Sequence, residues 1–549
     1  MVLAIKYTGS TRKVTFLLFL FALFQSLSVC AQEKNESWYI SNAPFKTPAI
    51  KLPVFESMTF SIIDYGAVGD GQTLNTAAFE KAITACSKQG GGKVLVPPGL
   101  WLTGPIQLQS NINLCVERGG LVLFTADHSQ YPIIKSSNTS SSLVTASPIY
   151  GYDLKNIAIT GEGIFDGAGD TWRPVKKIKT TDSQWKTLIA SGGVISKDGS
   201  LWWPTADAMN GDEYLKQLKK NNKKAPAADY LPARDFLRPY MLYLVNCENI
   251  LIEGITLRNS PKFVFYPNHC TNLTMRNTII FNEWWAQNGD GIDISACKNV
   301  MIYKCTVSAG DDGICMKSSG GKEDDKGIFS LENIIVAACN VYHAHGGFVI
   351  GSNTDGGMRN IFVSDCNLVG TDVGLRFKSN AGRGGTVTDI FIKDIFMKDI
   401  GNEAILFDTY YEDVPAGVTK DELKTPRDKI PEFSNFHISN IFCNGAKKAI
   451  SITGLPDMPV HKIYFENITI SSDYGLTAMD AADLDFKDVK LICSKDPVNN
   501  LQNVKGFNVT NGFFPASSKI FIKADARSSG IKVNNTELRN VKEAIQTMK

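Results

Sequence analysis

The chain has 549 residues, 43% of them hydrophobic and 20% charged, which is the composition of a soluble protein with a large core or several domains. Its formal net charge is +2, so bulk charge gives no attraction to nucleic acid or to an anionic membrane. The lysine-rich stretch 216–224 is short, and we interpret it as a solvated loop.

The N-terminus has the pattern of a targeting signal. Basic residues before position 14 are followed by an apolar run, 14–29, and small residues then surround a cleavage point after Ala31. We expect residues 1–31 to be a signal peptide and the protein to be exported, to the periplasm or beyond. A lipoprotein acylated at Cys30 is the first alternative. A retained membrane anchor is the second, although the run is short for a span.

A polar, proline-containing leader, 32–58, comes before the first periodic pattern. The domain that we expect to fold, 59–549, begins with turn-rich sequence and one helix that Asn75 can cap. The apolar residues of this helix keep helical spacing at Phe79, Ala82, Ile83 and Cys86. We expect so short a helix to cover the open end of the first coil of a solenoid.

A repeat of the form Asn, apolar, any residue, apolar then runs along the chain. Its units begin at Asn156, Asn249, Asn272, Asn299, Asn333, Asn360 and Asp389, and from Asn249 the intervals are 23, 27, 34, 27 and 29 residues. Short strands joined by loops of variable length predict an all-β fold, a parallel β-helix, because the leucine spacing of leucine-rich repeats is missing and the period is too short for a propeller. Asparagines at equivalent turns can hydrogen-bond to one another up the stack.

Cysteines follow the same repeat. Cleavage of the signal leaves 11 of them, and Cys247, Cys270 and Cys297 each precede a repeat asparagine by two residues. We therefore expect most of the cysteines to be free thiols that pack as small hydrophobic residues. Metal ligation is the alternative, but the compact Cys/His spacing of a zinc site is missing.

One segment, about 172–239, interrupts the rhythm with mixed helical patterns, with Trp185, Trp202 and Trp203, and with many lysines. Insertions in solenoids form loops on one face, which is often the binding face.

Four short patches carry the residues of a candidate active site. They are Asn288-Gly289-Asp290-Gly291, Gly310-Asp311-Asp312-Gly313, His345-Gly346-Gly347 and Arg376-Phe377-Lys378. Asp290 and Asp311 are 21 residues apart, His345 follows after 34 and Arg376 after another 31, which are intervals of single coils. If one coil separates neighbouring patches, all four lie on one wall, on strands about 4.8 Å apart.

These patches, in this order, resemble the polygalacturonase family, glycoside hydrolase family 28. The stretches 64–71 and 161–167 also look like those of pectin-degrading β-helix enzymes, so the resemblance covers nearly the whole mature chain. Two positions depart from the family pattern, Gly289 and Ala344, and neither removes a reactive side chain. The resemblance implies a right-handed, pectin-lyase-like parallel β-helix that hydrolyses α-1,4-galacturonosyl linkages with inversion and without a metal or other cofactor.

The resemblance also implies roles for the acids: Asp311 is the general acid, and Asp290 and Asp312 orient and deprotonate water. Crowded carboxylates cannot all ionise cheaply, so one pKa should rise and supply the acid. His345 would tune the protonation of this cluster. The expected catalytic residues are therefore Asp290, Asp311, Asp312 and His345.

A substrate that carries carboxylates needs cations beside these acids. Arg376 and Lys378 flank Phe377, so on a strand both face outward while Phe377 faces the core. With Asn288 and Arg383 they form the expected substrate-binding set. The insertion before the catalytic coils, together with the stretch 370–378, which looks like that of exo-acting members, predicts release of single galacturonates from a chain end by a protein that we expect to be monomeric.

Other functions stay open at this point. Rhamnogalacturonan is the alternative substrate. A polysaccharide lyase on the same fold would use Ca²⁺ held by acids and an arginine or lysine base. A non-catalytic β-helix adhesin would need no convergent acids.

Overall fold

The computed structural model describes residues 34–222, 224–319, 329–411 and 429–547. The predicted signal peptide, including Cys30, therefore lies outside the described residues. The chain divides into two parts, 1–43 and 44–549. In the first, a short helix, α2 (Glu36–Ser41), is capped by Asn35, whose side chain accepts a hydrogen bond from the Trp38 N–H (2.9 Å). This helix lies within the leader, 32–58, where the sequence shows no periodic pattern that would predict a helix. No helix of the described ranges is both long and apolar enough to span a membrane.

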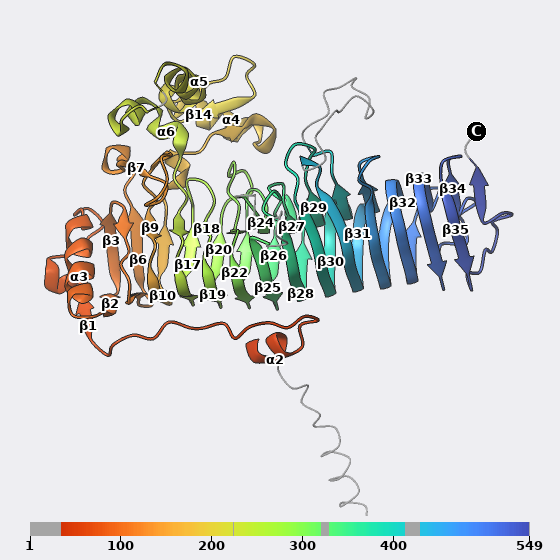
Figure 1. The fold of residues 1–549 in the computed structure, drawn as a ribbon. Helices are drawn as coiled ribbons and strands as arrows, with labels where there is room; N and C mark the ends of the chain where they lie inside the picture. Colours follow the sequence, from red (N-terminus) through yellow and green to blue (C-terminus); the bar gives the residue numbers. More distant parts are fainter. Residues whose placement is uncertain (1–33, 223, 320–328, 412–428, 548–549) are drawn as a thin grey trace, which may run out of the picture. The chain divides into compact units, whose positions relative to one another are not determined.

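The second part is a stack of coils built from parallel strands, as predicted (Figure 1). Successive coils add strands to three walls, and each strand of a wall pairs in parallel with its counterpart one coil away. The first wall begins with β1 (Thr59–Ser61), β2 (Gly92–Val96), β5 (Ile112–Val116), β10 (Lys155–Gly161), β16 (Glu248–Glu253), β19 (Thr271–Arg276), β22 (Lys298–Tyr303) and β25 (Leu331–Ala337). The second contains β3 (Gly99–Thr103), β6 (Gly120–Phe124), β11 (Ile164–Asp166), β17 (Thr256–Arg258), β20 (Ile279–Phe281), β23 (Thr306–Ser308) and β26 (Asn340–Tyr342).

The third wall carries the four patches. It contains β4 (Ile106–Gln107), β9 (Ile149–Tyr152), β15 (Leu242–Val245), β18 (Phe265–Asn268), β21 (Ile292–Ser295), β24 (Ile314–Lys317), β27 (Gly346–Ile350) and β29 (Val373–Lys378). Later strands turn the corners and serve more than one wall: β28 (Met358–Val369), β30 (Thr386–Asp408), β31 (Glu432–Thr453), β32 (Val460–Cys493) and β33 (Asn499–Thr510). The last coils end with β34 (Ile522–Ala524), β35 (Ser529–Asn534) and β36 (Ile545–Thr547).

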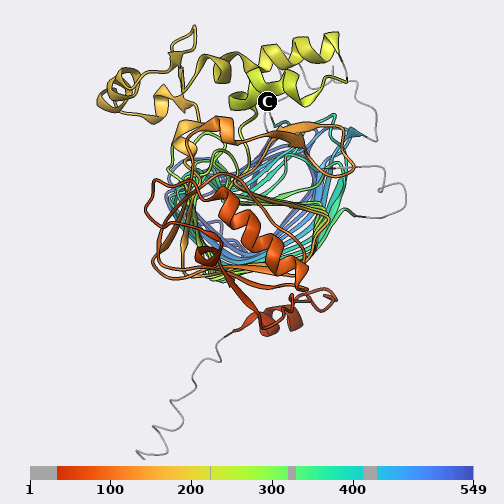
Figure 2. The ribbon, with the colours of Figure 1, turned by 90° about the vertical axis from the view of Figure 1, so that its left-hand side faces the viewer.

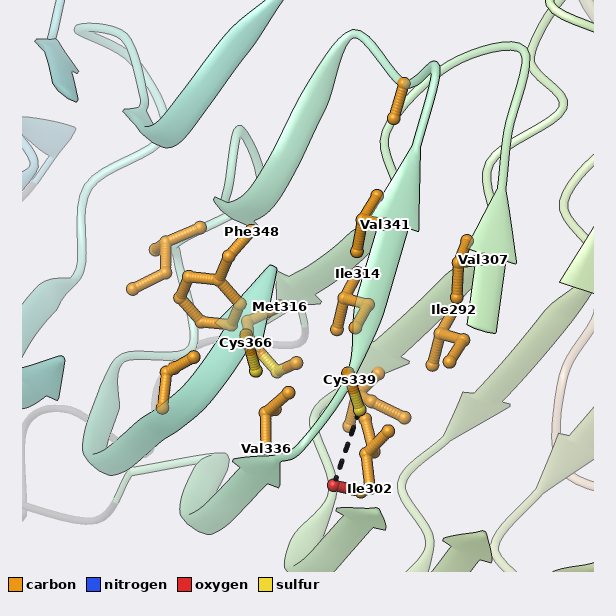
Figure 3. Close-up of a cluster of buried hydrophobic side chains, with 14 of the residues drawn as sticks. Ile292, Ile302, Val307, Ile314, Met316, Val336, Cys339, Val341, Phe348 and Cys366 are labelled. Carbon is orange, nitrogen blue, oxygen red and sulfur yellow. Dashed lines mark hydrogen bonds between the residues drawn. The ribbon is translucent and has the colours of Figure 1, made fainter. Parts of the chain in front are cut away.

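The core fills the space between the walls (Figure 3). Alternate residues of each strand point inward, so aliphatic side chains from successive coils stack on one another. Around the candidate site, Ile292 and Ile314 of the third wall meet Ile302 and Val336 of the first, all of them 2% exposed or less. Each of the eleven cysteines from Cys86 onward is a free thiol, and all but Cys115 are buried, which confirms the expectation for these residues.

A ladder of asparagines runs up one corner of the stack, as the repeat predicted. The side-chain N–H of each donates to the side-chain oxygen of its counterpart one coil earlier, at 3.0–3.3 Å, through Asn111, Asn156, Asn249, Asn272, Asn299, Asn333 and Asn360. These residues have a positive φ, such as +58° at Asn299, a conformation that asparagine tolerates better than most residues.

The predicted capping helix is α3 (Thr76–Lys88), which lies across the end of the first coils (Figure 2). Its buried face, including Phe79 and Ile83, joins the main core. Asn75 occupies the cap position, but its side chain does not cap the helix. Instead it accepts a hydrogen bond from the Val68 N–H (2.7 Å) and donates to the carbonyl of Leu102 (3.1 Å), so it ties the preceding turn to the coil.

The insertion is a small substructure outside the coil stack (Figures 1 and 2). It contains β12 (Val175–Lys176), a 3₁₀ turn (Lys177–Lys179), α4 (Asp182–Ala190), β13 (Val194–Ile195), β14 (Leu201–Trp203), α5 (Ala206–Asn221), a second 3₁₀ turn (Ala227–Ala233) and α6 (Arg234–Leu237). The prediction of a lysine-rich loop was wrong for 216–221, which form the last turns of α5. These lysines follow helical spacing with Leu215 buried beneath them, so helix formation outweighed their charge.

The asparagine ladder gives a test of how the coils hold together. Asn299→Ala loses two ladder hydrogen bonds and places alanine at φ +58°, whereas Asn299→Gly loses only the bonds. At about 0.5–1.5 kcal/mol per bond and about 1–2 kcal/mol for the left-handed alanine, we expect the alanine variant to be the less stable of the two. Thermal unfolding of both measures this. If both variants lost the same stability, the left-handed backbone conformation of residue 299 would not destabilise alanine relative to glycine.

Candidate active site

The four patches meet on the outer face of the third wall. Asp290 comes just before β21, Asp311 and Asp312 just before β24, and His345 just before β27. Because these strands are consecutive rungs of one parallel sheet, their entry loops lie side by side. Carboxylate oxygens of Asp290, Asp311 and Asp312 lie within 4.8 Å of one another. This confirms the prediction that the three acids lie close together in space.

Asp312 is buried between two cations. Its Oδ2 lies 2.7 Å from Lys378 Nζ, and its Oδ1 lies 3.1 Å from Arg376 Nη1. Arg376 and Lys378 point outward from β29 while Phe377 is buried in the core, as the alternation predicted. Burial alone would raise the pKa of Asp312, but these cations and Lys317 outweigh it and hold the pKa at about 2. Asp312 is therefore an ionised carboxylate at neutral pH.

Asp290 has the opposite environment. It is 4% exposed, and burial, followed by the nearby charges of Asp293 and Asp311, raises its pKa well above 3.8. Lys317 Nζ lies 3.9 Å from its Oδ2 and 3.1 Å from Asp293 Oδ1. Asp293 is itself fully buried, which raises its pKa to about 6 despite this ion pair. Of these neighbouring acids, Asp312 is therefore held in its ionised form by cations, whereas burial and nearby acids favour the protonated form of Asp290.

Asp311 is the most accessible of the three acids. Its side chain is 20% exposed, against 5% for Asp290 and 2% for Asp312. His345 Nδ1 lies 3.1 Å from Asp311 Oδ1, and the His345 N–H also donates to the Asp311 carbonyl (2.8 Å). The imidazole therefore holds one oxygen of Asp311 in place.

The insertion reaches this site with two cations. Lys179 Nζ contacts His345 Nε2 (3.0 Å), and Arg238 donates to Asn288 Oδ1 (2.9 Å) and to the Gln287 carbonyl (3.0 Å). Asn288 of the predicted substrate-binding set is thus held by Arg238. Arg383 of the same set lies past the end of β29, where its Nε donates to Asn380 Oδ1 (3.0 Å).

Toward the N-terminal coils, the outer face of the third wall is covered. Tyr243 and Tyr266 lie on the rungs before Asp293, with their rings stacked at 5.6 Å between centroids. The hairpin of β7 (Ile133–Lys135) and β8 (Leu143–Thr145) packs on this cluster through Ile134 and through Ala146 just after β8. Tyr243 is only 6% exposed as a result. The hairpin therefore covers the aromatic side chains of these rungs.

The carboxylates are close enough to share a metal ion, which bears on the lyase alternative. Asp312 is paired with Lys378 and Arg376, and Asp290 lies beside Lys317. A calcium ion would have to compete with these three cations for the same oxygens.

Sequence reasoning missed four residues of this site: Lys179, Arg238, Asp293 and Lys317. A signal existed for two of them, because Asp293 in β21 and Lys317 in β24 occupy outward positions that alternate with buried aliphatic residues. Lys179 and Arg238 had no such signal, since they come from the insertion, which has no coil register.

Comparison with known proteins agrees with this geometry. The model of glycosyl hydrolases family 28 matches residues 176–493, and that of rhamnogalacturonase A/epimerase, pectate lyase-like, matches 59–185. The chain is 28% identical over 450 residues to an exo-poly-alpha-D-galacturonosidase of Dickeya chrysanthemi, covering 78% of this chain and 70% of that one. It is 26% identical over 430 residues to a probable polygalacturonase of Vitis vinifera, covering 75% and 74%.

Solved structures give the same picture. A hyperthermoactive exopolygalacturonase from Thermotoga maritima superposes with a TM-score of 0.62 at 28% identity, covering 77% of this chain and 89% of that one. A family 28 exopolygalacturonase from Yersinia enterocolitica superposes at 0.63 with 21% identity, covering 84% and 79%, and shows the shared fold.

The different surroundings of Asp311 and Asp312 predict different effects on stability. Asp312→Asn leaves the buried Lys378 and the half-buried Arg376 without their counter-ion, so we expect it to lower the free energy of unfolding by about 3–5 kcal/mol. Asp311→Asn, at a partly exposed position, should cost about 1 kcal/mol or less. Denaturant unfolding at neutral pH compares the two.

The pH dependence of the free energy of unfolding tests whether the ion pairs of Asp312 cause this difference in stability. Since the pKa of Asp312 is lowered from 3.8 to about 2, its stabilisation is present above pH 3.8 and is lost as the pH falls toward 2. The difference in the free energy of unfolding between the wild type and Asp312→Asn should therefore become smaller as the pH falls from 3.8 toward 2. A gap that does not change with pH would contradict the ion-pair explanation.

Proposed function

The chain belongs to glycosyl hydrolases family 28, and on that premise we propose that it hydrolyses α-1,4-galacturonosyl linkages of homogalacturonan from a chain end. The observation that carries the proposal is the meeting of Asp290, Asp311 and Asp312 with Arg376 and Lys378 on one wall. Glycoside hydrolysis needs a proton donor and a carboxylate that activates water, and this wall offers carboxyl groups in both states.

We assign the general acid to Asp311. It is the most exposed of the three acids, and because Oδ1 faces His345, its Oδ2 is left for the proton that goes to the leaving oxygen. Asp312, which stays ionised, accepts a proton from the attacking water. Asp290 holds that water beside Asp312, and its raised pKa makes it the second candidate for the acid.

The cations have a double task in this proposal. Arg376 and Lys378 keep Asp312 ionised, and they give the cleft positive charge for the carboxylate of a galacturonate. Tyr411 lies under both of them, with Lys378 Nζ 4.7 Å from its ring centroid.

We propose inversion of the anomeric centre, as the family resemblance implies. The acid oxygens lie within 4.8 Å, which is closer than the roughly 6.5–9.5 Å usual for inverting pairs. A third acid relaxes this constraint, because water held between Asp290 and Asp312 lies to the side of Asp311 rather than in line with it.

We propose exo action because two features outside the coils contact the third wall, and in this proposal they close one end of the substrate cleft. The insertion reaches the catalytic wall through Lys179 and Arg238, so it does not merely decorate the far side of the fold. The tyrosine cluster under the β7–β8 hairpin covers the wall on the N-terminal side of the acids. The relatives named as exo-acting agree with this proposal. From the expected signal peptide we also propose that the protein is exported, so that it can reach pectic polymers outside the cytoplasm.

The first test is Asp311→Asn on polygalacturonate. The amide has no acidic proton, so we expect turnover to fall about 10²–10⁴-fold while the protein stays folded. Reducing-sugar release measures this, with thermal unfolding as the control. Near-normal turnover would refute the assignment. The same loss confined to Asp290→Asn would move the acid to that residue.

The second test is the course of the reaction. A closed pocket should release monomer from the first minutes while viscosity falls slowly, and proton NMR should show the β anomer first. Mixed oligomers with a rapid loss of viscosity would refute exo action but leave hydrolysis standing. Rhamnogalacturonan assayed in parallel tests the alternative substrate, which the match of residues 59–185 to the rhamnogalacturonase A/epimerase, pectate lyase-like model leaves open. Products that absorb ultraviolet light would identify a lyase.

A further inference from the structure

Lys179 joins the insertion to the catalytic wall through a single ammonium group. Its Nζ lies 2.9 Å from the Trp284 carbonyl, 3.1 Å from the Gly310 carbonyl and 3.0 Å from His345 Nε2. Gly310 directly precedes Asp311, so the same group contacts both the loop and the imidazole that hold this acid. The side chain is inserted between the strand-entry loops, and its position is fixed by three contacts.

The number of protons on the Lys179 ammonium group decides which tautomer the His345 imidazole adopts. An ammonium group has three protons and no lone pair, and two of its partners are carbonyls, which only accept. The third proton therefore points at His345 Nε2, which must accept it. The proton of the neutral ring is then on Nδ1, which faces Asp311 Oδ1 at 3.1 Å.

We propose that Lys179 is a positioning residue that fixes His345 in the Nδ1–H tautomer and thereby reserves Oδ2 of Asp311 for the substrate. The inference rests on the proposed role of Asp311 and deepens it. It also gives the insertion a chemical task besides closing the cleft, since the acid is correctly presented only while the insertion is in place.

Other charged groups around the imidazole do not account for this tautomer. Asp372 Oδ2 lies 3.7 Å from His345 Nε2, which is too long for a hydrogen bond. His343 lines the same small cavity beside Lys179 and His345. With Lys179 removed, Asp372 becomes the group facing Nε2, and a second proton there would be stabilised. An imidazolium would then form beside Asp311 and favour its ionised form, which cannot act as an acid.

The state of the ring can be observed directly. The chain has only six histidines, so ¹⁵N-histidine labelling with long-range ¹H–¹⁵N correlation resolves their tautomers, and His345→Asn identifies the signal. We expect the Nδ1–H form in the wild type. We expect Lys179→Met to take up a second proton at Nε2 at a pH at least one unit higher than the wild type does. Lys177→Met, at an exposed position of the same turn, is the matched control and should match the wild type.

Two outcomes would overturn the proposal. An Nε2–H ring in the wild type would mean that Lys179 is a neutral amine that accepts from histidine, and an unchanged titration in Lys179→Met would mean that Asp311 alone sets the tautomer. The wild-type spectrum needs no variant, so the first outcome is readable even if Lys179→Met folds poorly.

Kinetics give an independent reading. The ratio of kcat/KM at pH 5 to that at pH 7 should fall about tenfold in Lys179→Met, as a shift of one pKa unit implies, and stay constant in Lys177→Met. An equal loss at both pH values would indicate a structural role and refute the proposal. Failure of the wild type to hydrolyse any pectic polymer would instead refute the proposed function, while the spectrum would still report the tautomer.

Discussion

The arrangement of charged residues on the third wall depends on the parallel pairing of successive strands. Because side chains alternate across a strand, the register that buries Ile292 and Ile314 also turns Asp293 and Lys317 outward. A slip of one residue would turn these charges into the core between the walls and turn the aliphatic side chains out of it. The asparagine ladder and the stacked core resist such a slip, so the same interactions that stabilise the solenoid also align the acids.

Alignment alone would produce an unstable cluster, since like charges this close repel one another. The wall offsets the repulsion with cations placed by the same register: Lys317 beside Asp290 and Asp293, and Arg376 and Lys378 beside Asp312. Buried ion pairs add little net stability once desolvation is counted. Their effect here is to separate the protonation states of neighbouring carboxyl groups, which is what acid–base hydrolysis requires.

A solenoid wall made only of repeats is a groove open at both ends. The parts that contact the outer face of the third wall here come from outside the repeat, namely the β7–β8 hairpin and the insertion. Both act through side chains that reach the wall rather than through added strands. The fold therefore combines coils that carry the acids and their cations with irregular segments that contact them from outside the repeat.

The sequence by itself determined the repeat, and with it the parallel β-helix, the capping helix, the asparagine ladder and the one wall shared by Asp290, Asp311, His345 and Arg376. These follow from local periodicity, since a residue's place in a coil fixes where its side chain points. Its failures were also local: the lysines of 216–221 are helical, and Asn75 anchors a turn instead of capping α3.

Only the tertiary structure decided which carboxyl groups are charged and what the insertion touches. Burial and the distances to Lys317, Arg376 and Lys378 set the pKa values of Asp290 and Asp312, and neither quantity has a signature in the sequence. Lys179 lies 166 residues before His345 along the chain yet contacts its ring. A contact of that kind depends on how an irregular segment folds back over the coils, because no periodic pattern records it.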